Sequence, residues 1–195
     1  MGLDAGGLRD VLEGGLKDVA GRVVHKLAGD DAVPHELTAE PAFKSDLPWA
    51  QAPDAECLVL VCGDCHYLPH IDRFILEGLK LANYYIVAVP GGVQWLALPD
   101  ILPKHNKVAR GLVEFLVKRH NVKRIVCIAH EDCGAYNDSQ VMGAIAHLAT
   151  GKTVAEHQID QLRTAGRFLT DTFGVIVELY YASVAGSEVQ FHKVE

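Results

Sequence analysis

The sequence predicts an α/β fold, in which a parallel-core β-sheet is flanked by helices and preceded by an N-terminal helix and an extended arm. The first observation is a set of four short, almost wholly apolar runs at residues 57–62, 84–89, 124–130 and 175–182. Such runs are typical of parallel strands that are covered on both faces. The second observation is that apolar residues recur at helical spacing between these runs, which predicts right-handed strand–helix–strand crossovers.

Residues 1–56 have a different texture and are predicted to form a separate part of the chain. Apolar residues in 4–27 recur near helical spacing, which favours an amphipathic helix weakened by several glycines. Residues 30–56 hold four of the eight prolines and show no period, so we expect an extended arm there. A coil of that length is uncommon within a compact domain, so we expect it to pack on its own surface or on a partner subunit.

Residues 57–195 are predicted to form a single α/β domain. Its helices are expected at 71–81, 108–117 and 154–173, where the apolar positions follow a helical period. The closing segment, 188–194, is predicted to be an edge strand. The parallel core is thus expected to place the carboxyl ends of its strands at one edge of the sheet.

The composition is that of a globular protein, with 49% apolar and 22% charged residues in a chain of 195. The net charge is −7 and Lys and Arg do not cluster, so nucleic acid and anionic lipid are poor candidates for partners. No apolar run reaches the roughly 18–20 residues that cross a bilayer, and the N-terminus does not read as a signal peptide. The cysteine count is odd, at five, which suits a reducing compartment, and we expect a cytoplasmic protein.

Two clusters of metal-ligand side chains follow two of the predicted strands, at residues 62–66 and 130–134. In open α/β sheets, ligands bind at the carboxyl ends of the strands, so neighbouring strands would bring Cys62, His130 and Cys133 together. Two thiolates and an imidazole suit Zn²⁺, which is tetrahedral and leaves a fourth position open to water in catalytic sites. The sequence therefore predicts that 57–195 is a zinc-binding domain.

The order of these residues resembles the β-class carbonic anhydrases. The matched motif residues are Cys62, Asp64, His130, Cys133, Gly134 and Ala135. The resemblance extends to Leu112–Phe115 and to the closing strand and hairpin, and it covers roughly residues 56–195. It implies a parallel α/β sheet, a zinc site near a dimer interface and a homodimer or higher homo-oligomer. It also implies reversible hydration of carbon dioxide to bicarbonate by zinc-bound hydroxide.

The chain departs from the family pattern at one position of the first motif. The family has Cys-x-Asp-x-Arg, in which the Arg holds the Asp off the metal, whereas this chain has His66 in place of the Arg. The resemblance implies that Asp64 orients the nucleophile, and His66 is expected to act either as its substitute anchor or as a proton shuttle. Arg73 is an alternative partner for Asp64. The segment 89–92 also differs, reading Val-Pro-Gly-Gly where the family usually has Arg-Asn-Ala-Gly.

Several alternatives remain open at this point. The chain is expected to be an enzyme acting on a small molecule, and carbonyl sulfide or carbon disulfide is an alternative substrate on the same scaffold. A second alternative is a non-catalytic zinc protein in which Asp64 or Cys65 closes the fourth position of the metal. A third is a redox pair formed by Cys62 and Cys65. Cys57 and Cys127 lie inside apolar strands and are predicted to be buried small hydrophobes.

Overall fold

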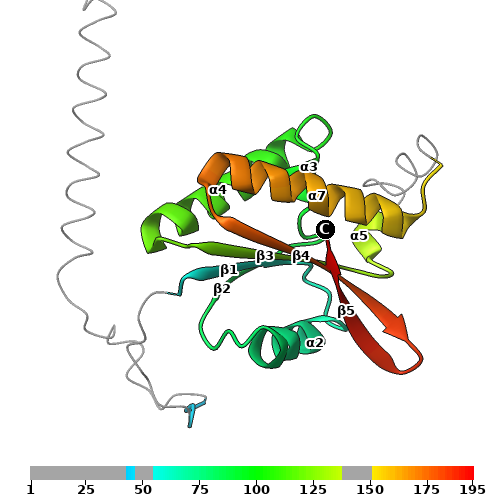
Figure 1. The fold of residues 1–195 in the computed structure, drawn as a ribbon, viewed down its shortest axis with the longest axis horizontal. Helices are drawn as coiled ribbons and strands as arrows, with labels where there is room; N and C mark the ends of the chain where they lie inside the picture. The colour runs from blue at the N-terminus through cyan, green and yellow to red at the C-terminus, as the bar shows by residue number, and fades with distance from the viewer. Residues whose placement is uncertain (1–42, 47–54, 138–150) are drawn as a thin grey trace, which may run out of the picture. The chain divides into compact units, whose positions relative to one another are not determined.

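The computed structural model describes residues 43–46, 55–137 and 151–195, drawn in colour in Figure 1. Within these residues, five strands form one sheet in the order β2-β1-β3-β4-β5. Their bounds are Cys57–Val61 (β1), Tyr85–Ala88 (β2), Arg124–His130 (β3), Ile176–Ala185 (β4) and Glu188–Val194 (β5). Strands β2, β1, β3 and β4 pair in parallel, and β5 pairs antiparallel with β4 at the edge. The predicted α/β fold class is therefore confirmed, with β5 as the expected edge strand.

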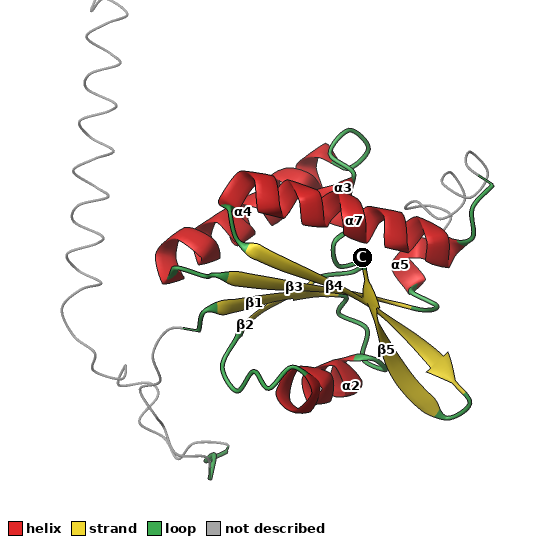
Figure 2. Ribbon diagram, viewed as in Figure 1, coloured by secondary structure: helices red, strands yellow, loops and turns green. Residues whose placement is uncertain are grey.

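Helices cover both faces of the sheet (Figures 1 and 2). On one face lie α3 (Gln94–Ala97), α4 (Pro103–His120) and α7 (Val154–Phe173). On the other face lie α2 (Leu68–Arg73) and the π-helical segment η2 (Phe74–Gly78), while the short helix α5 (Gly134–Asn137) follows β3. This arrangement explains why the strands read as continuous apolar runs, since each face of the sheet is covered.

Two clusters of buried apolar side chains fill the two layers. Leu58 and Ile125 belong to the cluster that includes α7 residues such as Leu162. Their neighbours Val59 and Val126 belong to the cluster beneath α2 and η2. Successive side chains of a strand point to opposite faces, so β1 and β3 contribute to both layers at once. All five residues of β1 are buried as a result.

The pairing of β1 with β3 positions the ends of both strands. The register runs from Cys57 opposite Arg124 to Val61 opposite Ile128, with the strands parallel. The carboxyl ends of the two strands therefore lie side by side at one edge of the sheet. The residues that follow β1 and the last residue of β3 meet there, as the sequence predicted.

Helix α7 agrees with its predicted bounds, and its ends carry the local signals for starting and stopping. Thr153 and Glu156 form a reciprocal capping box at the start, in which each side chain bonds to the backbone N–H of the other residue. Gly174 follows the last turn with a φ of 65°, the left-handed conformation that glycine adopts without strain. These caps are encoded within a few residues, so they are legible in the sequence.

Other helix bounds differ from the prediction. The helix expected at 71–81 begins at Leu68, where a proline occupies the first turn, and its η2 continuation ends at Gly78. The helix expected at 108–117 is longer in both directions, from Pro103 to His120, because its terminal turns carry polar residues that leave no apolar period. Helices α3 and α5 have four residues each and were missed, since so short a helix shows no periodicity.

The predictions for the N-terminal part lie almost wholly outside the described residues. The helix expected at 4–27 and most of the arm at 30–56 fall there, and the division between 1–56 and 57–195 stays a prediction. Within the described residues, no helix combines the length and the apolarity that crossing a bilayer requires.

Candidate metal centre

The first residue of the candidate centre, Cys62, follows directly after the buried strand β1 and is itself buried. The turn after β2 packs closely against it. Gly92 has a φ of 53°, and a Cβ there would lie 3.1 Å from the Cys62 backbone nitrogen. The backbone N–H of Gly91 hydrogen-bonds to the Cys62 thiol. Glycine is therefore required at position 92 for this approach, and the second turn supports the cysteine.

The other two residues come from the end of β3 and the turn after it. His130 is the last residue of β3, and Cys133 comes just before α5; both are 1% exposed. Asp132, between them, adopts the left-handed conformation with a φ of 52°, which turns the chain within three residues. A His-x-x-Cys segment thereby presents both side chains to the same buried volume.

The three side chains meet, as the strand order predicted. The Sγ atoms of Cys62 and Cys133 lie 3.7 Å apart. One ligand atom from each of the two cysteines and from His130 lies within 4.8 Å of the other two. The neighbouring parallel strands β1 and β3 are the cause, since they end side by side.

The ring of His130 is oriented so that one nitrogen has a partner and the other has none. Nδ1 donates a hydrogen bond to the carbonyl oxygen of Glu131 at 2.8 Å, which assigns the proton to Nδ1 and a lone pair to Nε2. Nε2 is buried and has no hydrogen-bond partner. The ring of Tyr67 covers the imidazole, with the two centroids 4.1 Å apart. A buried polar atom without a partner is costly, and the lone pair of this nitrogen is available to a ligand such as a metal ion.

The electrostatics of the cluster favour ionised ligands. The hydrogen bond with Cys133, followed by the effects of the nearby His130 ring and the Gly91 backbone N–H, lowers the pKa of Cys62 to about 4 against the effect of burial. The same hydrogen bond raises the pKa of Cys133, because the first thiolate holds the second proton. Burial lowers the pKa of His130, but the nearby Cys62 sulfur and the hydrogen bond to the Glu131 carbonyl outweigh it and raise the pKa. The pKa of Cys62 is thus lowered and that of Cys133 raised, which favours one thiolate in the pair.

The donor set suits zinc. Two sulfurs and one imidazole nitrogen are the ligands that Zn²⁺ takes, and a fourth position is left for water in sites of three protein ligands. The unpartnered Nε2 of His130 and the close approach of the two Sγ atoms are the observations that fit this ion. The Nδ1–carbonyl bond is the kind of outer contact that orients a ligating histidine.

Asp64 and His66 lie at the rim of the centre and contact each other. The Asp64 Oδ1 atom accepts a hydrogen bond from the His66 backbone N–H at 2.8 Å and lies 3.2 Å from the His66 Nδ1 atom. The backbone bond is the main reason that the pKa of Asp64 is lowered, so the carboxylate is ionised. The side chain of His66 is 86% exposed, while that of Asp64 is 25% exposed. The carboxylate therefore lies between the buried cluster and solvent.

The remaining candidates of the first motif are placed elsewhere. Cys65 is exposed, does not join the buried group, and has its Sγ 3.8 Å from the His66 Nδ1 atom. The Arg73 Nε atom pairs with Glu77 at 3.0 Å, so Arg73 is not the partner of Asp64 in this structure. The expectation that Cys57 and Cys127 are buried is confirmed, and burial raises the pKa of both thiols.

A pocket of about 920 Å³ opens beside the rim residues. Its lining includes Asp64, His66, Tyr67, Glu131, Asp132 and Tyr181. Two of these carboxylates are engaged with the protein. Glu131 accepts the backbone N–H of Val184 at 2.8 Å, and Asp132 accepts the side-chain amide of Asn137 at 2.7 Å. Asp64 is the lining carboxylate of the first motif, two residues after Cys62.

Sequence reasoning missed two kinds of residue at this centre. Tyr67, which covers the ring of His130, follows the first motif but carries no spacing signal. Gln158 on α7 donates a hydrogen bond to the His130 backbone carbonyl at 3.0 Å, although it is 28 residues away along the chain. A glutamine in a helix carries no sequence signal of such a contact.

Comparisons with known proteins give distant similarities. No protein-family model matches the chain. It is 25% identical over 139 residues to an uncharacterized protein of Rickettsia conorii, covering 65% of this chain and 73% of that protein.

Solved structures of carbonic anhydrases are also similar to this chain. One is β-carbonic anhydrase isoform I of Trichomonas vaginalis, at 12% identity and a TM-score of 0.47, covering 90% of this chain and 96% of that one. Another is a tetrameric β-carbonic anhydrase of Sordaria macrospora, at 13% identity and a TM-score of 0.42, covering 93% and 96%. The chain is thus similar to proteins of the family that its motif residues resemble, the β-class carbonic anhydrases.

Proposed function

We propose that this chain is a zinc enzyme of the β-carbonic anhydrase type, which hydrates carbon dioxide reversibly to bicarbonate. The observation that carries the proposal is the unpartnered, buried Nε2 atom of His130 beside two cysteine thiols. The order of the motif residues adds support, because the same residues carry the resemblance to the family. Cys62, His130 and Cys133 are the proposed metal ligands.

The ion would supply one kind of chemistry. Zn²⁺ held by Cys62, His130 and Cys133 acts as a Lewis acid that makes water a nucleophile near neutral pH. The protein contributes the preset ligands, since Nδ1 of His130 is held by a backbone carbonyl and Cys62 by a backbone N–H. It also buries the ligands, which excludes competing solvent.

Asp64 is the proposed orienting group of the reaction. Its carboxylate is ionised and lines the pocket, so it can accept a hydrogen bond from the attacking water and direct the oxygen lone pair at the substrate carbon. The Oδ1 atom of Asp64 contacts the backbone N–H and the ring of His66. An anchored carboxylate is thereby kept from closing the fourth position of the metal.

His66 is proposed to replace the family's arginine as the anchor of Asp64 and to pass a proton to solvent. The two roles fit its position, because one ring nitrogen lies against Asp64 while most of the side chain is exposed. A histidine exchanges protons near neutral pH, which an arginine does not. The histidine in place of the arginine would thus both anchor Asp64 and pass a proton to solvent.

The test is stopped-flow hydration of carbon dioxide by protein whose zinc content has been measured. The intact chain is expected to exceed the buffer rate across pH 6–9, and Asp64→Asn to lose most of that rate while keeping its zinc. Asp100→Asn, an exposed aspartate in another loop, is the matched control and should keep both. A zinc-loaded chain no faster than buffer would overturn the hydratase proposal and leave two alternatives, a hydrolase of carbonyl sulfide or carbon disulfide and a non-catalytic zinc protein.

The proposal includes a homo-oligomer, a homodimer or a larger assembly, whose contacts include residues 1–56. Its support within the described residues is an exposed apolar row on α4. Val108, Leu112 and Phe115 are 55%, 42% and 60% exposed and share one face of the helix. Sedimentation of the full chain should give a mass above that of the monomer, and Phe115→Ser should lower it. Val184→Ser, which alters an equally exposed residue on β4, should not.

A cytoplasmic location is part of the same proposal. All five cysteines are free in the structure, although two thiols lie 3.7 Å apart. Free thiols in a metal centre suit a reducing compartment. Fractionation of the source cells with an antibody against the full chain would test the location directly.

A further inference from the structure

Two glutamines on α7 are buried against the segment that carries the second motif. Gln158 is 1% exposed and Gln161 is 4% exposed, and they lie three residues apart on one face of the helix. Burying an amide in an apolar layer is costly unless it forms hydrogen bonds. The partners of these amides therefore indicate what the helix gains from them.

The side chain of Gln158 hydrogen-bonds to the backbone of His130, which is the first of the two proposed ligands in that segment. Its Nε2 atom donates to the carbonyl oxygen of His130 at 3.0 Å. His130 is the last residue of β3, and the parallel pairing of its strand with β4 ends there. A helix side chain thus bonds to the chain at the point where the strand gives way to the turn.

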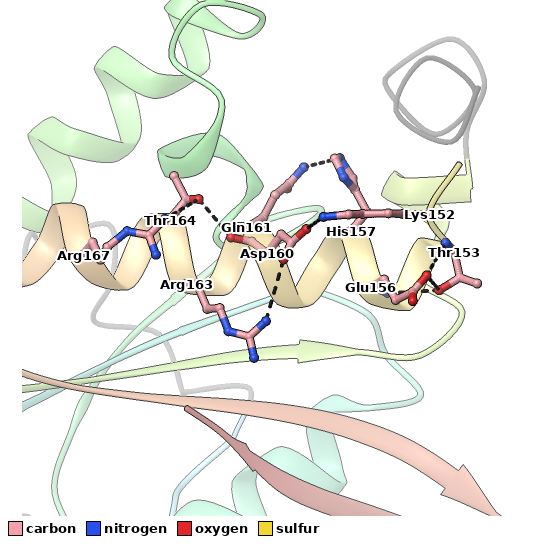
Figure 3. A network of polar contacts seen from close by, with 9 residues as sticks. All are labelled: Lys152, Thr153, Glu156, His157, Asp160, Gln161, Arg163, Thr164 and Arg167. Carbon is pink, nitrogen blue, oxygen red and sulfur yellow. Dashed lines mark hydrogen bonds and ion pairs between the residues drawn. The ribbon is translucent and has the colours of Figure 1, made fainter. Parts of the chain in front are cut away.

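Gln161 holds the other end of the segment through Tyr136. The Tyr136 hydroxyl donates to the Gln161 Oε1 atom at 2.6 Å, and Tyr136 is buried with its ring against Cys62 and Cys133. The Gln161 Nε2 atom lies 2.7 Å from the His157 Nε2 atom. Figure 3 marks this contact with a dashed line. Because Oε1 accepts from the tyrosine, Nε2 must donate to the histidine. The amide is therefore held at both of its ends.

Helix α7 is itself anchored at the end that carries these residues. The capping box of Thr153 and Glu156 closes its first turn, and Lys152 pairs with Asp160 (Figure 3). Leu162, on the same helix, is fully buried in the layer against the sheet. The two glutamines thus lie on a helix whose own position is held by these contacts.

We propose that Gln158, Gln161 and Tyr136 are positioning residues, which hold the turn from His130 to Cys133 so that the ligand atoms stay grouped before a metal binds. The inference rests on the proposed zinc centre. It assigns a role to the buried amides of α7 that the motif residues themselves do not fill. None of the three is a proposed metal ligand, and their hydrogen bonds reach the turn through the His130 carbonyl and the Tyr136 hydroxyl.

The first test uses the metal-free full chain and requires no activity. Alkylation by iodoacetamide is followed cysteine by cysteine by mass spectrometry. Tyr136→Phe and Gln161→Leu are expected to raise the alkylation rate of Cys133 by about tenfold, because a loosened turn opens more often. Cys127, buried inside β3, reports global unfolding and should keep its rate. Equal acceleration of both cysteines would mean a general loss of stability and would overturn the proposal.

The second test measures zinc affinity by competition with a chelating dye. Removing an outer contact to a metal ligand typically weakens binding by 10–100-fold, and we expect a loss of that size in Gln158→Leu and Tyr136→Phe. Matched controls remove similar bonds elsewhere. Asn106→Leu removes a buried amide that donates to the Trp95 and Leu96 carbonyls, and Tyr180→Phe removes a tyrosine hydroxyl that donates to Glu178. Both controls should bind zinc as the unmodified chain does.

The two tests separate this inference from the proposed function. A chain that binds no zinc overturns the proposed function, and the alkylation rates still decide whether the glutamines hold the turn. A chain that binds zinc with equal affinity in all variants, and whose Cys133 reacts at one rate throughout, overturns the positioning role alone.

Discussion

The two ends of β3 carry polar side chains on the same face, and their surroundings differ. Arg124 begins the strand and His130 ends it. Residues six apart in a strand point to the same side. Arg124 is paired with Glu178, with nitrogen–oxygen distances of 2.7 and 3.0 Å, and Tyr180 donates to the same carboxylate at 2.8 Å. His130 has its Nδ1 bonded but its Nε2 atom without a partner.

The difference separates a polar group that is paired within the protein from one that, under the proposed function, binds a ligand. At the amino end, the charge of Arg124 is neutralised by the carboxylate of Glu178, which also accepts a hydrogen bond from the Arg124 Nη2 atom. At the carboxyl end, a nitrogen lone pair and two thiols are left facing one another. Burying such a group costs stability, and under the proposed function an ion that bound there would recover the cost. The following predictions test whether the two ends divide their roles in this way.

The largest expected effect is the loss of zinc on removal of a ligand. Cys133→Ser should weaken zinc binding by at least about 100-fold, since removing a ligand should cost more than removing an outer contact. Glu178→Gln, at the other end of the sheet, should leave zinc content unchanged. Metal content of purified protein, measured by mass spectrometry with inductively coupled plasma, checks both. Full zinc in Cys133→Ser would mean that the metal is placed wrongly.

The next effect is on stability and should fall on the opposite end. Glu178→Gln leaves Arg124 without its carboxylate in a partly buried place and should lower the free energy of unfolding by about 1–3 kcal/mol. Glu77→Gln, which breaks an exposed pair with Arg73, should cause no measurable change. Urea unfolding of the metal-free proteins measures the difference. A stable Glu178→Gln would remove the structural role given to this pair.

The same pair predicts a dependence of stability on pH. Burial raises the pKa of Glu178, but hydrogen bonds from Arg124 and Tyr180 outweigh it, and the pKa lies below its ordinary value of 4.5. A carboxylate with a lowered pKa stabilises the fold above the unfolded-state pKa, and the contribution is lost as pH falls through the folded-state pKa. The stability difference between the unmodified chain and Glu178→Gln should therefore shrink below about pH 4.5. A difference that stays constant down to pH 3 would contradict the assignment.

The smallest expected effect is that of Cys65→Ser. Cys65 is exposed and lies outside the buried group, so the variant should keep near-full zinc. X-ray absorption at the zinc edge should report two sulfur ligands in both proteins. Three sulfurs in the unmodified chain, or zinc loss in the variant to the level of Cys133→Ser, would instead support the closed site of three cysteines and one histidine.

Much of the fold was legible in the sequence because its signals are local. The bounds of β3, β5 and α7 agree with the prediction, since apolar runs and the helical spacing of apolar residues are set by neighbours along the chain. The predicted helix bounds were wrong at the ends of α4, where polar residues leave no apolar period, and α3 was missed because it has only four residues. The strand ends then predicted where the motif residues meet.

The sequence by itself determined the parallel α/β core and the grouping of Cys62, His130 and Cys133 at the ends of neighbouring strands. The tertiary structure alone decided which neighbours take part. It placed His66 against Asp64, paired Arg73 with Glu77 and left Cys65 exposed. The physical reason is that burial and hydrogen-bond partners depend on residues distant in sequence. Whether a side chain near a motif faces the core, a partner or solvent is settled only when the strands and helices pack.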